Sequence, residues 1–148
     1  MTEGFNGDEW ILHFLDDATR LNFVYTLPVK SLTTDSVQEF ITWVRRRFGY
    51  EVKIFRTDNE TSLGKRFTTW IKEKGYTVES STPYTPEQNG AVEKSGHAII
   101  VKARSIRIAA NLPENLWPEV VKAAGYLLNR TPIRSLKWKS PIKMLEAY

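Results

Sequence analysis

Residues 56–94, RTDNETSLGKRFTTWIKEKGYTVESSTPYTPEQNGAVEK, contain the pattern that decides the fold. A short strand is predicted over 51–57, and an amphipathic helix follows whose apolar stripe ends at Gly75. The next strand is predicted over 76–80, and two prolines and an Asn-Gly pair then favour a polar loop over 81–90. A long helix begins after this loop. The order strand, helix, strand, loop and helix predicts an α/β fold.

The residues before this stretch predict a hairpin and a helix. Apolar and β-branched residues flank a polar turn at 16–20, which favours a β-hairpin over 10–27. Apolar residues at helical spacing predict a helix over 34–48, with Ser36 and Glu39 as its capping box. These elements add a second pair of strands and a helix that buries one face.

Helices dominate the rest of the chain. A helix is expected to start near Pro113 and a short one after Pro141. The long helix is expected to bury Val92, Gly96, Ile99, Ala103, Ile106 and Ala110. The helix near Pro113 is expected to turn inward Trp117, Val120, Val121, Ala124, Leu127 and Leu128. We therefore expect a mixed sheet flanked by helices, in a single domain over 1–148 with 133–148 as a candidate C-terminal extension.

Composition limits the class of protein. With 148 residues and 41% hydrophobic residues, the chain is large enough for one domain with a real core. Twenty-one basic against 17 acidic residues give a net charge of +4, which favours a polyanionic partner. The absence of cysteine excludes disulfides, a thiol nucleophile and Cys-ligated zinc within this chain. No apolar stretch is long enough to span a bilayer and no signal peptide is recognised, so we expect an intracellular protein without a membrane partner.

Two carboxylates separated by 35 positions are candidates for chemistry. Asp58 follows the predicted strand, where α/β sheets place ligand-binding groups, and Glu93 lies in the first turn of the long helix. Alone, Asp58 could cap a turn, and Glu93 could simply complement the helix N-terminus. The intervening elements could return the chain to the same sheet edge, where carboxylates that meet need a cation between them. Mg²⁺ or Mn²⁺ suits such oxygen ligands and would support phosphodiester chemistry.

Several motifs occur here in the order found in a known family. They are Phe14-Leu15-Asp16-Asp17-Ala18-Thr19-Arg20, Arg56-Thr57-Asp58-Asn59, Pro83-Tyr84-Thr85-Pro86-Glu87-Gln88-Asn89-Gly90-Ala91-Val92-Glu93-Lys94, Leu112-Pro113, Trp117 and Tyr126-Leu127-Leu128-Asn129-Arg130-Thr131-Pro132. This pattern resembles the integrase catalytic core of copia-type LTR retrotransposon polyproteins, which shares the ribonuclease H-like fold of retroviral integrases. The resemblance extends from about Trp10 to Pro141.

The resemblance implies specific roles for matching residues. Asp58 and Glu93 would be catalytic and would coordinate Mg²⁺ or Mn²⁺. The residues implied in DNA contact are Asn59, Gln88, Asn89, Lys94 and His97. Element ends and target DNA would be the partners of a nuclear enzyme that can form a homo-oligomer.

The sequence also departs from the family pattern. The family's first catalytic aspartate lies on a strand before the hairpin, and no Asp in an apolar strand precedes Trp10, so the chain is expected to lack that strand and to be inactive alone. Asp16 and Asp17 are expected to form the turn or pair with Arg20 rather than to replace it. Glu60 stands where relatives often have glycine.

Other residues have simpler structural explanations. His13, inside an apolar strand, is expected to be a hydrogen-bonded core histidine. The run from Arg45 to Arg47 could touch phosphate, but it is more typical of a solvated helix end that complements the dipole. Among the tryptophans, Trp70 and Trp117 are expected in the core. Trp43 and Trp138 fit no buried stripe and could serve an interface.

Three functions remain open from the sequence. The first is an integrase core that cleaves and joins DNA in the intact enzyme. The second is a catalytically incomplete DNA-binding or assembly module. The third is a degenerate remnant of an element.

Overall fold

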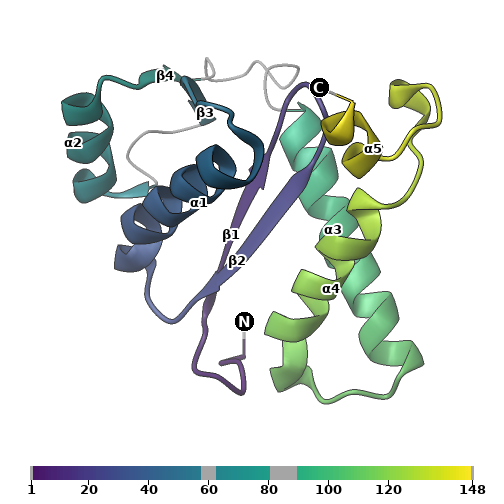
Figure 1. Cartoon of the computed structure of the whole chain (residues 1–148). Helices are drawn as coiled ribbons and strands as arrows, with labels where there is room; N and C mark the ends of the chain where they lie inside the picture. The colour runs from purple at the N-terminus through teal and green to yellow at the C-terminus, as the bar shows by residue number, and fades with distance from the viewer. Residues whose placement is uncertain (1, 58–62, 81–89, 148) are drawn as a thin grey trace. The chain divides into compact units, whose positions relative to one another are not determined.

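The computed structural model describes residues 2–57, 63–80 and 90–147 (Figure 1). The chain forms two units, one made of Met1–Pro28 with Ala91–Tyr148 and the other of Val29–Gly90. Residues 133–147 belong to the first unit, and the expectation of one domain over the whole chain stays a prediction.

The first unit contains the predicted hairpin. Strands β1 (Trp10–Leu15) and β2 (Asn22–Leu27) pair antiparallel, with Trp10 opposite Leu27 and Leu15 opposite Asn22. The connecting turn is held by side chains: an Asp16 carboxylate oxygen accepts hydrogen bonds from the Thr19 backbone N–H at 3.0 Å and from its hydroxyl at 2.5 Å.

The second aspartate of this turn has an equally local role. Asp17 forms an ion pair with Arg20 at 3.0 Å. Arg20 adopts a left-handed backbone with φ of 62°, which closes the turn. Turn formation by Asp16 and pairing of Asp17 with Arg20 are therefore both confirmed.

Helices complete the first unit. They are α3 (Gly90–Ala109), the 3₁₀ turn Glu114–Leu116, α4 (Trp117–Asn129), the 3₁₀ turn Arg134–Leu136 and α5 (Pro141–Glu146). Their core consists of Ile99, Ala103, Trp117, Val120, Val121 and Ala124, all six of which were expected to be buried. Helix α4 starts at Trp117 and not at Pro113, because the 3₁₀ turn intervenes.

Two inward-facing predictions for these helices were wrong. Ala110 lies beyond the end of α3 and is exposed. Leu127 is 43% exposed because α4 approaches β2 through Gly125, where an added Cβ would lie 2.9 Å from Val24 Cγ2. This close approach turns the buried face of α4 toward Gly125 and leaves Leu127 at its margin.

The second unit is a β-α-β arrangement preceded by a helix. After the 3₁₀ turn Lys30–Leu32 it contains α1 (Thr33–Phe48), β3 (Ile54–Thr57), α2 (Lys65–Lys74) and β4 (Thr77–Ser80). Strands β3 and β4 pair in parallel. Aromatic rings pack α2 onto this pair, with centroids of Phe55 and Phe67 6.2 Å apart and those of Trp70 and Tyr76 5.6 Å apart.

The capping box predicted for α1 was wrong. The helix begins at Thr33, directly after the 3₁₀ turn, and no side chain caps its N-terminus. The Thr33 hydroxyl donates instead to the Lys30 carbonyl at 2.7 Å, and Ser36 is buried within the first turn. The 3₁₀ turn leads directly into the helix, so the helix begins before Ser36, the residue predicted to cap it.

Both kinds of strand pairing expected of a mixed sheet are present. The antiparallel pair and the parallel pair belong to two separate two-stranded sheets in the part of the chain that the structure describes. No helix among these residues is long and apolar enough to cross a membrane.

Candidate metal and DNA site

The parallel strands β3 and β4 end at the same edge of their sheet. Thr57, the last residue of β3, is the register partner of Ser80, the last residue of β4. Asp58 follows Thr57 directly in the sequence, and residues 81–89 follow Ser80. Strand ends of this kind are common positions for binding groups in α/β folds.

Four predicted site residues lie outside the described residues. They are Asp58, Asn59, Gln88 and Asn89. Their roles in metal or DNA binding therefore stay predictions. Within 2–57, 63–80 and 90–147, no three His, Asp or Glu side chains gather as a metal-binding group.

Glu93 is the predicted metal ligand whose surroundings the structure describes. It lies in the first turn of α3 and is exposed. No residue in the described ranges forms an ion pair with its carboxylate, whose oxygens are the hard ligands that Mg²⁺ and Mn²⁺ prefer. Its exposure and donor chemistry are compatible with a divalent-cation ligand.

Lys94 and His97 are the two described residues predicted to contact DNA. Both are exposed on α3. His97 lies four residues after Glu93, so Glu93 and His97 share a helix face. Lys94 directly follows the first turn of α3, and a cation near a helix N-terminus adds to the positive end of the helix, which favours phosphate. The DNA contacts of Lys94 and His97 stay predictions.

A partly buried polar network ties the N-terminal part of α3 to the hairpin. Asn22 Oδ1 accepts a hydrogen bond from the Ser95 hydroxyl at 2.5 Å and lies 2.8 Å from His13 Nε2. Because Asn22 Nδ2 points to Asn129 Oδ1 at 3.4 Å, Asn22 Oδ1 is the acceptor and the neutral His13 ring donates through Nε2–H. Ser95, two residues after Glu93, is thereby joined to β2.

Asn129 continues this network from the end of α4. Its Oδ1 accepts from the Asn22 backbone N–H at 2.7 Å, and its Nδ2 donates to the Asn22 carbonyl at 2.8 Å. The side-chain amide thus pairs with the free edge of β2 as a neighbouring peptide group would. No pattern in the sequence predicts this pairing, since the two residues are 107 positions apart.

The expectation that His13 is a hydrogen-bonded core histidine is confirmed. Burial lowers the pKa of His13, and the hydrogen bond with Asn22 opposes this shift only in part. Desolvation disfavours the charged imidazolium, so His13 is held neutral. Its place in the network explains a histidine inside an apolar strand.

Asp8 also serves the fold. It is buried, and its carboxylate accepts hydrogen bonds from the Asn6 side chain at 2.9 Å and from the Thr26 hydroxyl. These bonds fasten the segment before β1 to β2. The carboxylate of Asp8 is therefore engaged in structural contacts.

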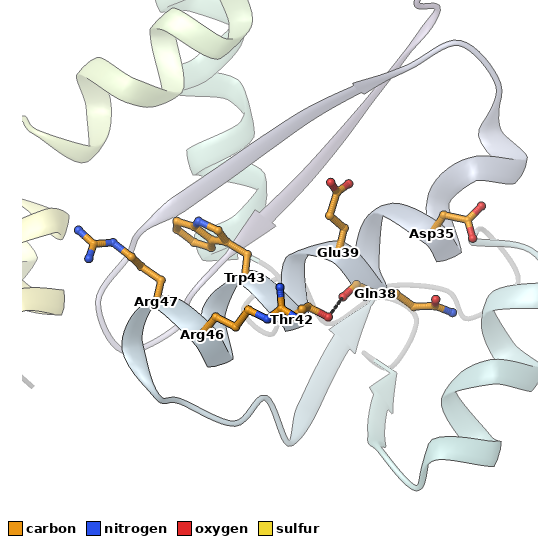
Figure 2. Close-up of a pocket in the computed structure, with 7 residues that line it drawn as sticks. All are labelled: Asp35, Gln38, Glu39, Thr42, Trp43, Arg46 and Arg47. Atoms are coloured by element: carbon orange, nitrogen blue, oxygen red, sulfur yellow. Dashed lines mark hydrogen bonds between the residues drawn. The ribbon is translucent and has the colours of Figure 1, made fainter.

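The arginine run at the end of α1 lies on a solvated surface, as expected. Arg45 engages Glu51 through two hydrogen bonds of 2.7 and 2.9 Å, and this contact lowers the pKa of Glu51. Figure 2 shows an open hollow along the helix, lined by Asp35, Gln38, Glu39, Thr42, Trp43, Arg46 and Arg47. Trp43 is 43% exposed, in keeping with its absence from any buried stripe. Because acidic and basic side chains both line the hollow, its charge favours neither sign of ligand.

Comparison with known proteins agrees with the resemblance in the sequence. No family model matches the chain. The retrovirus-related Pol polyprotein from transposon TNT 1-94 of Nicotiana tabacum is 34% identical over 140 residues, which is 94% of this chain and 10% of that protein. The chain therefore spans about a tenth of the length of this relative.

Solved structures share the fold. One is the simian T-cell lymphotropic virus intasome in complex with a PP2A regulatory subunit, with a TM-score of 0.67, 14% identity and coverage of 91% of this chain and 51% of that chain. Another is the catalytic core domain of BIV integrase, with a TM-score of 0.64, 19% identity and coverage of 93% and 85%. The α/β fold of this chain is therefore similar to that of retroviral integrase catalytic cores.

Proposed function

We propose that this chain, which is homologous to the integrase catalytic core of copia-like retrotransposon Pol polyproteins, contributes two metal-binding carboxylates to DNA integration. Asp58 and Glu93 are these carboxylates. The observation that carries the proposal concerns Glu93: this residue is exposed in the first turn of α3, while Ser95, two residues later in the helix, donates a hydrogen bond to Asn22 of β2. The N-terminal part of α3 is thus held in place, and the carboxylate of Glu93 remains open to a ligand.

Mg²⁺ or Mn²⁺ is the cofactor that this donor chemistry suits. When bound, such ions polarise the scissile phosphodiester and stabilise the charge that develops on its oxygens. The protein's own residues bind and orient: Asp58 and Glu93 provide oxygen ligands, and Lys94 attracts phosphate beside the helix N-terminus. Asn59, Gln88, Asn89 and His97 are proposed to contact the DNA around this site.

The partners follow from the same proposal. Element ends and target DNA are the substrates, and the place of action is the nucleus. An integrase that joins two DNA ends to one target needs more than one copy of the core, so we propose a homo-oligomer.

Cation binding by the chain tests the carboxylates without requiring catalysis. Mn²⁺ broadens amide NMR signals near its site, so the signals of Glu93 and its α3 neighbours should broaden at low Mn²⁺ concentrations. Asp58→Asn and Glu93→Gln should each weaken Mn²⁺ binding by about tenfold or more, equivalent to at least about 1.4 kcal/mol. Glu114→Gln, which removes an exposed carboxylate from the turn before α4, is the matched control.

The outcomes of this titration separate the alternatives. Equal Mn²⁺ affinity for the Glu93→Gln variant and the unchanged chain would refute the metal site. Activity is tested separately, in a longer chain that adds an upstream strand with an Asp: Mg²⁺-dependent strand transfer should occur and Asp58→Asn should abolish it. Strand transfer that survives Asp58→Asn would exclude this residue from catalysis.

A second function, DNA binding or assembly without catalysis, is favoured by one observation. The C-terminal part of the chain combines a strong excess of basic residues with exposed aromatic rings. An Asp58→Asn/Glu93→Gln double variant that still binds DNA in EDTA, with affinity that falls as salt rises, would support this function. No binding at low salt would contradict it.

A further inference from the structure

Basic residues are concentrated in the C-terminal part of the chain. Residues 120–145 contain no Asp or Glu and six basic residues: Lys122, Arg130, Arg134, Lys137, Lys139 and Lys143. The rest of the chain then has 15 basic and 17 acidic residues, so this segment carries the whole positive excess. A segment with one sign of charge favours an anionic partner.

A constrained loop within this segment presents a tryptophan. In the Trp138 loop, defined here as residues 133–139, Ile133 and Lys139 form an antiparallel bridge. The Trp138 backbone N–H donates to the Ile133 carbonyl at 3.0 Å, and the buried Leu136 anchors the loop. Its Trp138 side chain is nevertheless 68% exposed, which is unusual for so large an apolar group.

The backbone of this loop is strained at the tryptophan. Lys137 and Trp138 both adopt left-handed conformations, with φ of 54° and 64°. Side chains other than glycine occupy this region at a cost, and such strain concentrates at functional positions. The hydrogen bonds of the loop hold the Trp138 backbone in this conformation, so the backbone has little freedom left to lose on binding.

Three cations surround Trp138 in the sequence and remain available. Arg134, Lys137 and Lys139 are exposed and form no ion pair with any residue that the structure describes. Lys143, by contrast, pairs with Glu146 at 3.6 Å. The loop thus combines one flat ring with three positive charges that a ligand can reach.

We propose that the Trp138 loop binds single-stranded nucleic acid. Trp138 stacks on an unpaired base, and Arg134, Lys137 and Lys139 contact the adjacent phosphates. Stacking requires an accessible base face, which favours a single strand over an intact duplex. A membrane surface would call for several apolar side chains, whereas Leu136 beside Trp138 is buried. This binding site goes beyond the proposed metal site and does not depend on it.

Anisotropy titrations of a fluorescein-labelled oligothymidylate and of a labelled duplex, both in EDTA, test the proposal. Trp138→Ala should weaken oligothymidylate binding by about tenfold, whereas Trp138→Phe should retain most of the affinity because it keeps a stacking ring. The double variant Lys137→Gln/Lys139→Gln should reduce the slope of log affinity against log salt by about 0.7 for each phosphate that the protein no longer neutralises.

Matched variants serve as controls for the ring and for the charge. Trp43→Ala removes an exposed tryptophan from the other unit, and Lys122→Gln removes a cation that pairs with Glu119 at 3.9 Å. Neither should change the affinity. Circular dichroism of each variant checks that its fold is intact.

Three results would overturn the proposal. One is oligothymidylate affinity that Trp138→Ala leaves unchanged in a folded protein. Another is that Trp138→Ala reduces the affinity for oligothymidylate and the affinity for duplex equally, which would mean that base stacking is not involved. The third is Trp138-dependent binding to phosphatidylserine vesicles without any Trp138 effect on the oligonucleotide, which would identify a membrane contact instead.

Discussion

Replacing Asn129 by leucine should destabilise the protein strongly, although Asn129 lies at the end of a helix. Its amide pairs with the backbone N–H and C=O of Asn22 at 2.7 and 2.8 Å. Leucine has the same branched shape with a larger volume, but it cannot donate or accept a hydrogen bond. Each buried polar group left without a partner costs about 1–3 kcal/mol, so two such groups cost about 2–6 kcal/mol.

The partial exposure of Asn129 places the expected loss in the lower part of this range. Water can reach the edge of the site and replace some of the missing hydrogen bonds, which gives about 2–4 kcal/mol. A domain is stable by only about 5–15 kcal/mol, so the change is readily measured. Asn129→Asp should be costly as well, since it sets a carboxylate oxygen against the Asn22 carbonyl.

Urea unfolding followed by circular dichroism and by tryptophan fluorescence measures this loss. Asn115→Ala is the control, because the exposed Asn115 side chain has no hydrogen bond with any residue that the structure describes. Its free energy of unfolding should stay within about 0.5 kcal/mol of the unchanged chain. If Asn129→Leu costs no more than this control, the amide does not close the edge of β2.

Three further substitutions test separate contacts. Because burial lowers the pKa of His13, this imidazole is protonated in the unfolded chain at a higher pH than in the folded chain. The contribution of His13 to stability is therefore complete above about pH 6.5 and declines below it. Urea unfolding should therefore show that the free energy of unfolding falls less between pH 7.5 and pH 5 for His13→Gln than for the unchanged chain. An unchanged pH dependence would contradict this. Gly125→Ala should cost about 1–3 kcal/mol because its Cβ would lie 2.9 Å from Val24 Cγ2, and Val24→Ala in the same chain should recover part of the loss in thermal unfolding. Asp16→Ala should lower stability by about 1–2 kcal/mol by removing the hydrogen bonds of the turn while Mn²⁺ affinity stays unchanged; a tenfold weaker Mn²⁺ affinity would instead make Asp16 part of the metal site.

Local chemistry was sufficient to predict much of the fold. The hairpin and its turn follow from two runs rich in apolar and β-branched residues and from Asp16 and Asp17, whose partners are three residues away. The core faces of α3 and α4 follow largely from helical periodicity, since Ile99 and Ala103 in α3, like Val120 and Ala124 in α4, are four residues apart and lie on one face of their helix.

Pairings between distant residues could not be predicted in the same way. Asn129 reaches Asn22 because α4 packs on the hairpin, and the sequence around a helical amide does not identify its hydrogen-bond partner. Leu127 belongs to the apolar pattern of α4, but it is exposed because α4 approaches β2 through Gly125. In both cases tertiary packing between distant elements decides the contacts of the residue, and the periodicity of the sequence does not predict that packing.

The polar network gives a physical reason why a site residue can be exposed and still be positioned. Glu93 has no ion pair within the described residues, so its own contacts do not place it. Two residues later, Ser95 donates into Asn22, which Asn129 holds from α4. An apolar contact there could slide, whereas hydrogen bonds between these partly buried groups are directional. We infer that this network positions the N-terminal part of α3, which carries Glu93, and leaves the carboxylate itself free for its ligand.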